Sequence, residues 1–226
     1  LFIIKKSGIP GIVGGIAMAI GFTAYVFAMS KTTVANVLFI ISTQTIWLAL
    51  FGYFFLKEKI SFRTFLSIIL AMIGISIMIG GSISTGSMQG NLVALFIPIN
   101  FAFLVLLIRK YSNLDLIPAL FYGGLIIMII AFFKSESILI SGHNLLVGFL
   151  LGTFQHAFGF ICIVIAARST PAVVVGLLML TETLLGPFWV WIFLDEVPPL
   201  SVFMGGGIII LAVIFKTLEQ KYKRTS

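Results

Sequence analysis

Eight predominantly apolar stretches, each long enough to cross a bilayer as a helix, dominate the sequence and limit what it can fold into. A membrane's hydrocarbon core is about 30 Å thick and takes about 20 helical residues to span, roughly twice the length of a transmembrane β-strand. With 60% hydrophobic and 9% charged residues, against roughly 25% charged in soluble domains, the chain is predicted to be an all-α polytopic membrane protein. The predicted spans are 10–29, 33–56, 61–80, 91–108, 116–133, 145–166, 172–194 and 200–218.

The positive charges are divided unequally between the two sides that alternating spans define. Twelve Lys and Arg residues fall on one side, and only Lys31 and Lys134 fall on the other. Because cytoplasmic loops carry the excess of cations, both ends of this chain are predicted to be cytoplasmic, with 219–226 as a basic tail. The formal net charge of +7 follows from this topology, so no nucleic-acid partner is expected. We predict a multi-pass protein of the plasma (cell inner) membrane.

An internal repeat equates the first third of the chain with its end. Residues 11–77 and 149–215 align without a gap at a constant offset of 138 residues. The equated residues include Gly14 and Gly152, Gly21 and Gly159, Phe22 and Phe160, Thr32 and Thr170, Thr43 and Thr181, Thr45 and Thr183, Leu56 and Leu194, and Glu58 and Glu196. We interpret this pattern as a duplication.

The two copies are predicted to be inverted in the membrane. The second copy, 91–218, has five predicted helices, whereas 1–81 has only the three that match its end, so two further helices, about 47 residues, are expected before Leu1. An odd number of helices per copy reverses the second copy, and the cation count places Glu58 and Glu196 on opposite sides. Inverted repeats are typical of secondary transporters, in which the two halves rock around a shared site.

Short motifs at the helix ends resemble a known family. They are Ser30–Ala35 (SKTTVA) and Leu56–Ile60 (LKEKI) in the first copy, and Ala167–Ala172 (ARSTPA) and Leu194–Pro198 (LDEVP) in the second. This pattern resembles the EamA-type transporters of the drug/metabolite transporter superfamily. The resemblance implies a ten-helix carrier, of which the present helices are the third to the tenth, moving small metabolites around a central cavity.

Glu182 is the strongest candidate for substrate binding or coupling. It is the only carboxylate deep inside a predicted span, where facing lipid would cost an ionised side chain several kcal/mol. His156 lies at a similar depth in the preceding span, beside Gln155, and Gln44 occupies the position equivalent to Glu182. The Glu182–His156 pair could bind a coupled proton or a cationic group of the substrate. The alternative is an interhelical hydrogen-bonded cluster that only stabilises the second copy.

Three other polar or amphipathic side chains are weaker candidates for the cavity. Asn36 and Trp47 lie in the same predicted span as Gln44, and Asn100 follows Pro98 in the span 91–108. Trp47 could stack on a substrate or cation, although packing or an interfacial position is the alternative for it.

Glycine and proline predict helix packing and motion. Gly11-xxx-Gly15 and Gly148-xxx-Gly152 should let helices approach closely, and three glycines should open one face of the last span. Pro187 is a candidate hinge near Glu182. The three glycines of the last span are Gly205, Gly206 and Gly207.

The predicted function is secondary-active transport of small metabolites, with amino-acid-like, nucleoside-like or organic-cation solutes as candidate substrates. A membrane enzyme acting on a lipid-linked substrate, a channel and a non-transporting scaffold are the alternatives. The sequence has no His-Glu-x-x-His motif and no phosphate-binding Gly-x-x-x-x-Gly-Lys-Ser/Thr segment, and Cys162 is its only cysteine. We therefore expect no catalytic residues, no metal site and no cofactor. The oligomeric state is left open.

Overall fold

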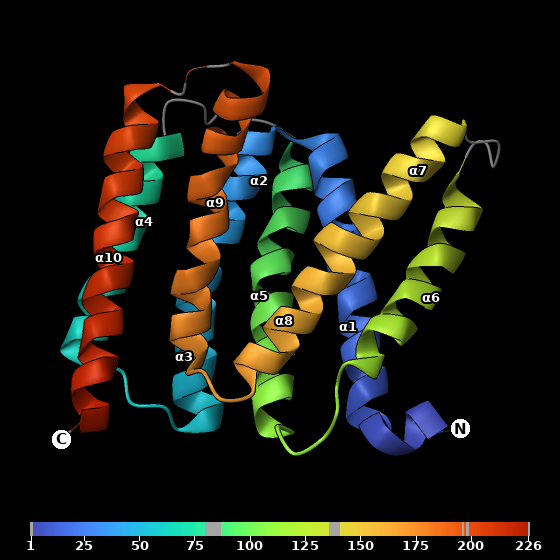
Figure 1. Ribbon diagram of the computed structural model, residues 1–226, viewed down its shortest axis with the longest axis horizontal. Coiled ribbons are helices and arrows are strands. Elements are labelled where there is room, and N and C mark those ends of the chain that lie inside the picture. Colours follow the sequence, from blue (N-terminus) through green and yellow to red (C-terminus); the bar gives the residue numbers. More distant parts are fainter. Residues whose placement is uncertain (1, 80–86, 136–140, 196, 198, 226) are drawn as a thin grey trace. The chain divides into compact units, whose positions relative to one another are not determined.

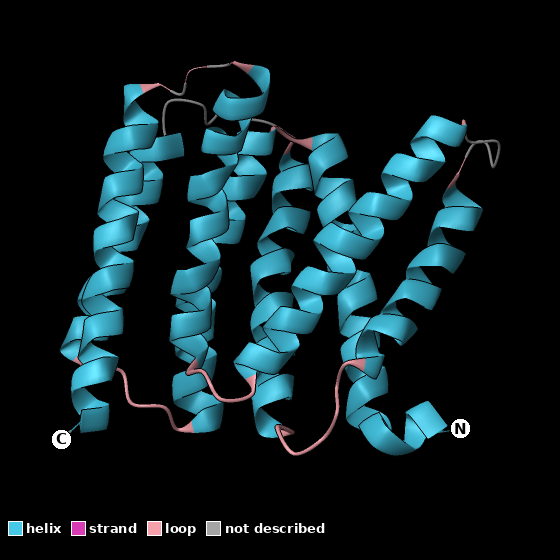
Figure 2. Cartoon of the chain, viewed as in Figure 1, coloured by secondary structure: helices cyan, strands magenta, loops and turns pink. Residues whose placement is uncertain are grey.

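The computed structural model describes residues 2–79, 87–135, 141–195, 197 and 199–225. These residues form helices joined by short loops, and the described ranges contain no strand (Figure 2). The helices, labelled in Figure 1, are α1 (Phe2–Lys31), α2 (Val34–Ser42), α3 (Gln44–Leu56), α4 (Phe62–Ile79), α5 (Met88–Lys110), α6 (Pro118–Lys134), α7 (Gly142–Leu150), the π-helix η2 (Leu151–Ala157), α8 (Phe158–Ala167), α9 (Ala172–Leu194) and α10 (Leu200–Thr225).

Several of these helices are suited to a membrane. By length and composition, four are long and apolar enough to cross one: Ser7–Lys31, Asn36–Leu56, Met88–Lys110 and Gly142–Ala167. The other four predicted spans coincide with shorter apolar helices: Phe62–Met78, Pro118–Lys134, Ala172–Glu182 and Leu200–Lys216. The all-helical, polytopic architecture is confirmed, whereas the total number of spans stays a prediction.

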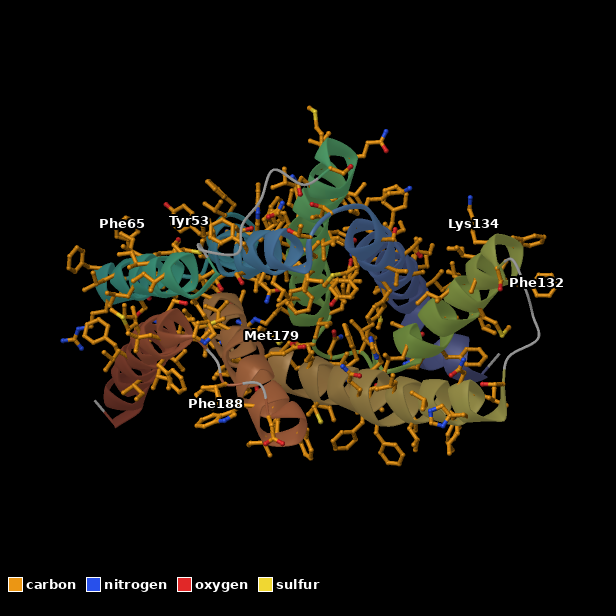
Figure 3. All side chains as sticks on the ribbon, turned by 90° about the horizontal axis from the view of Figure 1, so that it is seen from above. Tyr53, Phe65, Phe132, Lys134, Met179 and Phe188 are labelled. Atoms are coloured by element: carbon orange, nitrogen blue, oxygen red, sulfur yellow. The ribbon has the colours of Figure 1, made fainter. Side chains whose placement is uncertain are left out.

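Large apolar side chains are exposed along many of the helices. Phe65 on α4 and Phe132 on α6 are both more than half exposed and extend away from the helices that carry them (Figure 3). Water would disfavour so much exposed apolar surface, and lipid would not. The exposed side chains therefore agree with a lipid-facing surface.

The helices pack as two compact units. One comprises Leu1–Thr23 and Phe103–Thr170, and the other comprises Ala24–Ala102 and Pro171–Ser226. Each unit draws residues from both predicted copies. The boundaries 1–81 and 91–218 concern equivalence in sequence, and they stay a prediction, as does the tail 219–226.

In the first unit, α1 packs closely against α6 through glycine. A Cβ atom on Gly15 would lie 2.5 Å from Tyr122 Cβ and 2.9 Å from the carbonyl oxygen of Ala119. A Cβ atom on Gly123, on the opposing helix, would lie 3.1 Å from the Gly15 carbonyl oxygen. The close approach predicted from Gly11-xxx-Gly15 is therefore observed at Gly15, where any side chain would force the helices apart.

In the second unit, α4 and α10 cross in antiparallel orientation, side by side in Figure 1. Thr64 at the start of α4 contacts Lys216 towards the end of α10, whereas Met78 near the end of α4 lies against Gly205 near the start of α10. This crossing forms the largest part of a hydrophobic core that α9 completes. The buried members of the core are Ala71, Ile75, Met78, Leu177, Leu180, Val202, Ile209 and Ala212.

A second antiparallel pair, α3 and α9, also packs through glycine. A Cβ atom on Gly176 would lie 2.9 Å from Thr45 Cα, and one on Gly52 would lie 3.4 Å from Ala172 Cβ. The numbering along α9 rises as that along α3 falls, so the two helices run in opposite directions. The end of α3 therefore lies beside the start of α9.

α3 and α9 end in the same way. The residues that follow them, Lys57 (φ 56°) and Asp195 (φ 54°), adopt the left-handed conformation that commonly terminates a helix. Among the described residues, these two are the non-glycine positions with positive φ. They lie 138 residues apart.

Two predicted spans are less regular than the apolar pattern indicates, and the helix that contains a third, 10–29, is kinked just before that span begins. α1 is kinked at Gly8 (φ 58°), two residues before Pro10. The span 33–56 is divided at Thr43, because both the backbone N–H and the hydroxyl of Thr43 donate to the Ile40 carbonyl oxygen and tighten the turn there. The span 145–166 contains the π-helix η2.

Two predicted close contacts are not observed within the described residues. A Cβ atom on Gly148 or Gly152 would meet nothing within 4 Å, so no described helix approaches these glycines. The reason is that nearly every residue of α7 and η2 is exposed. Small residues permit close packing, but whether a helix lies opposite is decided by tertiary structure.

Candidate functional site

Glu182 lies in the middle of α9, on the exposed part of the helix. Its carboxylate interacts electrostatically with the phenol of Tyr25, which α1 contributes to the same unit. An ionisable side chain at this depth in a membrane must face water or protein, because lipid offers it no partner. Sequence reasoning missed Tyr25. A tyrosine in an apolar span is a weak signal, since most such residues are interfacial or packed.

His156 and Gln155 lie in η2, and both side chains are exposed. The His156 ring packs against Phe22 of α1, with ring centroids 5.2 Å apart, and Phe22 also makes an edge-to-face contact with Phe160 at 5.1 Å. π-helical turns widen a helix locally and occur often at functional sites. The predicted pair thus sits on an unusual piece of backbone beside an aromatic cluster.

The predicted pair of Glu182 and His156 has one member in each of the two units. Glu182 belongs to the unit formed by Ala24–Ala102 and Pro171–Ser226, and His156 to the other. The structure describes each unit by itself. The pairing therefore stays a prediction.

Gln44 and Trp47 both lie in α3. Gln44 is buried, and Trp47 is half-buried with its ring edge-to-face on Phe51, centroids 6.4 Å apart. Beside Gln44, the hydroxyl of Thr45 is fully buried and has no hydrogen-bond partner in the described part of the chain. A buried polar atom without a partner costs about 1–3 kcal/mol, so Thr45 marks a polar position that the packing of α3 does not satisfy.

Asn36 is held in a hydrogen-bonded cluster. Its amide nitrogen donates to Thr32 Oγ1 and to Asn91 Oδ1, both at 3.3 Å, and the Thr32 hydroxyl donates to Asn91 Oδ1 at 2.7 Å. The cluster joins the start of α2 to the start of α5. This arrangement gives Asn36 a structural role, whereas Asn100 lies half-buried within α5.

The hinge and packing candidates lie in α9 and α10. Pro187 lies within α9, and its side chain lies outside the described residues. In α10, Gly205 and Gly206 are buried and Gly207 is exposed. Gly205 lies against α4, whereas a Cβ atom on Gly207 would meet nothing within 4 Å.

A cluster of polar groups joins the cation-bearing end of α10 to α4. The ammonium of Lys216, which is buried, donates to Thr64 Oγ1 at 2.5 Å, and Thr64 Oγ1 lies 2.9 Å from Ser61 Oγ. In the other unit, Arg168 forms an ion pair with Asp115 at 3.0 Å. These contacts lie at or near the ends of helices, whereas the candidate residues described above lie within the spans.

Glu58 makes a contact that sequence reasoning missed. Its Oε2 accepts a hydrogen bond at 3.0 Å from the backbone N–H of Ala172, the first residue of α9. A contact between residues so distant in sequence leaves no local signal. Only the pairing of α3 with α9 brings them together.

A groove of about 630 Å³ lies between α3 and α4. Apart from Ser76, its lining residues are apolar, so it suits acyl chains better than a polar solute. We therefore do not place the substrate there. No group of three or more His, Cys, Asp or Glu side chains that could hold a metal ion occurs in the ranges described.

Comparisons with known proteins identify the family. The sequence profile of the EamA-like transporter family matches residues 3–80 and 85–218. A solved structure, described only as the crystal structure of a protein, superposes with a TM-score of 0.81 at 15% identity, covering 97% of this chain and 79% of that one, which shows a shared fold.

Two relatives are both named uncharacterized transporters. One, from Clostridium kluyveri, is 26% identical over 95% of this chain and 73% of its own length. The other, from Methanothermobacter thermautotrophicus, is 24% identical over 84% of this chain, which spans 58% of that relative. Given the profile match along almost the whole sequence, the chain belongs to the EamA-like transporter family of the drug/metabolite transporter superfamily, and these comparisons support a multi-pass membrane transporter.

Proposed function

We propose that the protein is a secondary-active carrier that moves small metabolites across the plasma membrane by alternating access between two inverted copies of one unit. Amino-acid-like, nucleoside-like and organic-cation solutes are the candidate substrates. Both ends of this chain face the cytoplasm in this proposal. The contact between Phe22 and Phe160 is the observation that carries it.

Phe22 and Phe160 are equated by the 138-residue offset, and their rings touch edge to face. In an arrangement with two-fold symmetry, a residue can contact its own equivalent only close to the symmetry axis. The ring of His156 packs on Phe22 and therefore lies near the proposed axis. Transporters built from inverted repeats bind their substrates at the interface between the repeats, near the middle of the membrane.

The antiparallel helix pairs give further support. The offset equates α4 with α10, and it equates the span formed by α2 and α3 with α9; each packs against its equivalent in the opposite direction, as inversion requires. Buried positions of α4 and α10 follow the same offset. For five buried residues of α4, the residue 138 positions later in α10 is also buried. The register pairs are Thr64 and Val202, Ser67 and Gly205, Ala71 and Ile209, Gly74 and Ala212, and Met78 and Lys216.

Glu182 supplies the charge that acts on the substrate or on a coupled proton in this proposal. It is titratable, it is accessible, and it lies at mid-span. A carboxylate that binds a proton or a cation in turn can couple their movements. His156 and Gln155 are proposed as its polar partners across the cavity.

Counterflow in proteoliposomes tests the proposal. Vesicles holding the reconstituted protein are loaded with unlabelled pools of amino acids, nucleosides or organic cations, and uptake of the matching labelled pool is measured. A carrier gives saturable uptake that exceeds equilibrium only in loaded vesicles, and Glu182→Gln is expected to reduce it at least tenfold. Linear flux would indicate a channel. No stimulated flux with any of the three pools would count against the carrier and in favour of the scaffold or the enzyme.

A further inference from the structure

The end of α3 lies beside the start of α9 (Figure 1), and Glu58 bridges the two there. Its Oε2 accepts the N–H of Ala172 at 3.0 Å, and its own backbone N–H donates to the Gly52 carbonyl oxygen at 2.9 Å. The backbone bond ties Glu58 to α3, and the side-chain bond ties it to α9. The side chain therefore connects two helices that belong to different copies of the proposed repeat.

Glu58 supplies the side-chain acceptor at the start of α9, whereas the equivalent start of α2 has a cap of its own. Thr33 precedes α2, and its side chain accepts a hydrogen bond from the Asn36 N–H at 3.3 Å. The equivalent residue before α9 is Pro171, which has no side-chain acceptor. The N–H groups at a helix start need acceptors and attract negative charge, and the Glu58 carboxylate supplies both from the other copy.

The surroundings of the carboxylate are closely packed. A Cβ atom on Gly52 would lie 2.8 Å from Glu58 Oε2, so a side chain there would displace the carboxylate from its present position. Next to the contact, further along the α3–α9 pair, Ala49 packs with Val173 and Val174 in a small buried cluster. In the structure this end of the α3–α9 interface is closed and the Glu58 hydrogen bond is present.

We propose that Glu58 is a latch between the two copies, whose hydrogen bond to the start of α9 holds this end of the carrier shut and must break when the transport path opens there. This inference rests on the proposed alternating-access function. It assigns Glu58 a positioning role, since the residue acts through the position of α9 and not on the substrate.

Thiol labelling tests the latch without requiring transport. Cys162 is the only cysteine, so Cys162→Ser gives a thiol-free background. Val174→Cys, buried in the cluster below Glu58, reports opening, and Ala212→Cys, buried in the α4–α10 core, reports general loss of structure. Labelling rates are measured with a maleimide in permeabilised membranes.

Removing the latch is expected to expose the first reporter alone. Glu58→Ala should raise the labelling rate of Val174→Cys about tenfold, the effect of losing a charged helix cap, and leave Ala212→Cys protected. Glu58→Asp, one methylene shorter, should behave like Glu58→Ala, and Glu58→Gln, which keeps an acceptor, should give a smaller increase. Lys59→Gln, a change at the exposed neighbour, should have no effect.

Pro171→Thr separates a latch from a simple helix cap. Pro171 has φ −54° and ψ 141°, close to the −73° and 147° of Thr33, so a threonine there can cap α9 locally. If Glu58 only caps the helix, Pro171→Thr restores protection in the Glu58→Ala background and overturns the proposal. Unchanged labelling of Val174→Cys in Glu58→Ala, or equal increases at both reporters, also overturns it. A protein that gives the expected labelling but no counterflow retains the latch and loses the proposed function.

Discussion

Gly205 and Gly207 lie two residues apart in α10 and offer a matched test of the α4–α10 crossing. A Cβ atom on Gly205 would overlap the carbonyl oxygen of Gly74 and lie 2.8 Å from both the backbone nitrogen and the Cβ of Met78. A Cβ atom on Gly207 would meet nothing within 4 Å. Gly205→Ala and Gly207→Ala therefore add the same methyl group to the same helix in opposite environments.

The magnitude follows from what the methyl group would meet. The neighbours of Gly205 are mostly backbone atoms of a helix, which cannot turn aside, so α4 and α10 must separate. Overpacking of this kind destabilises the folded state by about 1–3 kcal/mol, and the higher helix propensity of alanine offsets about 0.5–1 kcal/mol of this loss. We expect Gly205→Ala to lower the free energy of unfolding by about 1–2 kcal/mol and Gly207→Ala to leave it unchanged or raise it slightly.

Unfolding in mixed micelles, followed by circular dichroism as the SDS fraction increases, measures this difference. A loss of 1.4 kcal/mol lowers the ratio of folded to unfolded protein about tenfold, which the titration resolves readily. If the two variants unfold at the same SDS fraction, Gly205 does not face α4 as described. If Gly207→Ala is the less stable variant, then Gly207, and not Gly205, faces α4.

Three further substitutions have defined outcomes. Glu182→Gln should reduce counterflow at least tenfold while leaving the SDS unfolding midpoint within error, and full flux at every pH would contradict a mechanistic carboxylate. Thr64→Val should lower the free energy of unfolding by about 1–2 kcal/mol, because it removes the hydroxyl that accepts from Lys216; an unchanged midpoint would mean that this bond adds no stability. Asn91→Ala should have a similar cost by breaking the cluster with Asn36, and proteolysis near the start of α5 provides an independent readout.

The apolar helices could be predicted from the sequence because lipid leaves a chain of this composition few alternatives. A run of about 20 apolar residues must satisfy its backbone internally, and helices do so. The repeat is predicted from equated residues such as Phe22 and Phe160 and Glu58 and Glu196, and it stays a prediction. The short motifs at the helix ends indicate the family, and the profile match confirms it.

The contacts between helices could not be predicted in the same way. Gly148 and Gly152 have the spacing of a packing motif but no neighbour within 4 Å, whereas Gly74 and Gly176 lie in close crossings although neither belongs to a Gly-xxx-Gly pair. The Glu58 contact and the interaction of Tyr25 with Glu182 depend on which helices become neighbours. The break at Thr43 and the π-helix around His156 are local departures from an apolar pattern that is the same on either side of them.

The most direct test of the account asks on which side of the membrane the two equivalent loops lie. In the Cys162→Ser background, Lys59→Cys marks the loop after α3 and Val197→Cys marks the loop after α9, and both positions are exposed. A membrane-impermeant maleimide added to intact cells should label Val197→Cys at once and Lys59→Cys only after permeabilisation. Labelling of both cysteines from the same side would show that the copies are not inverted and would contradict the proposed mechanism.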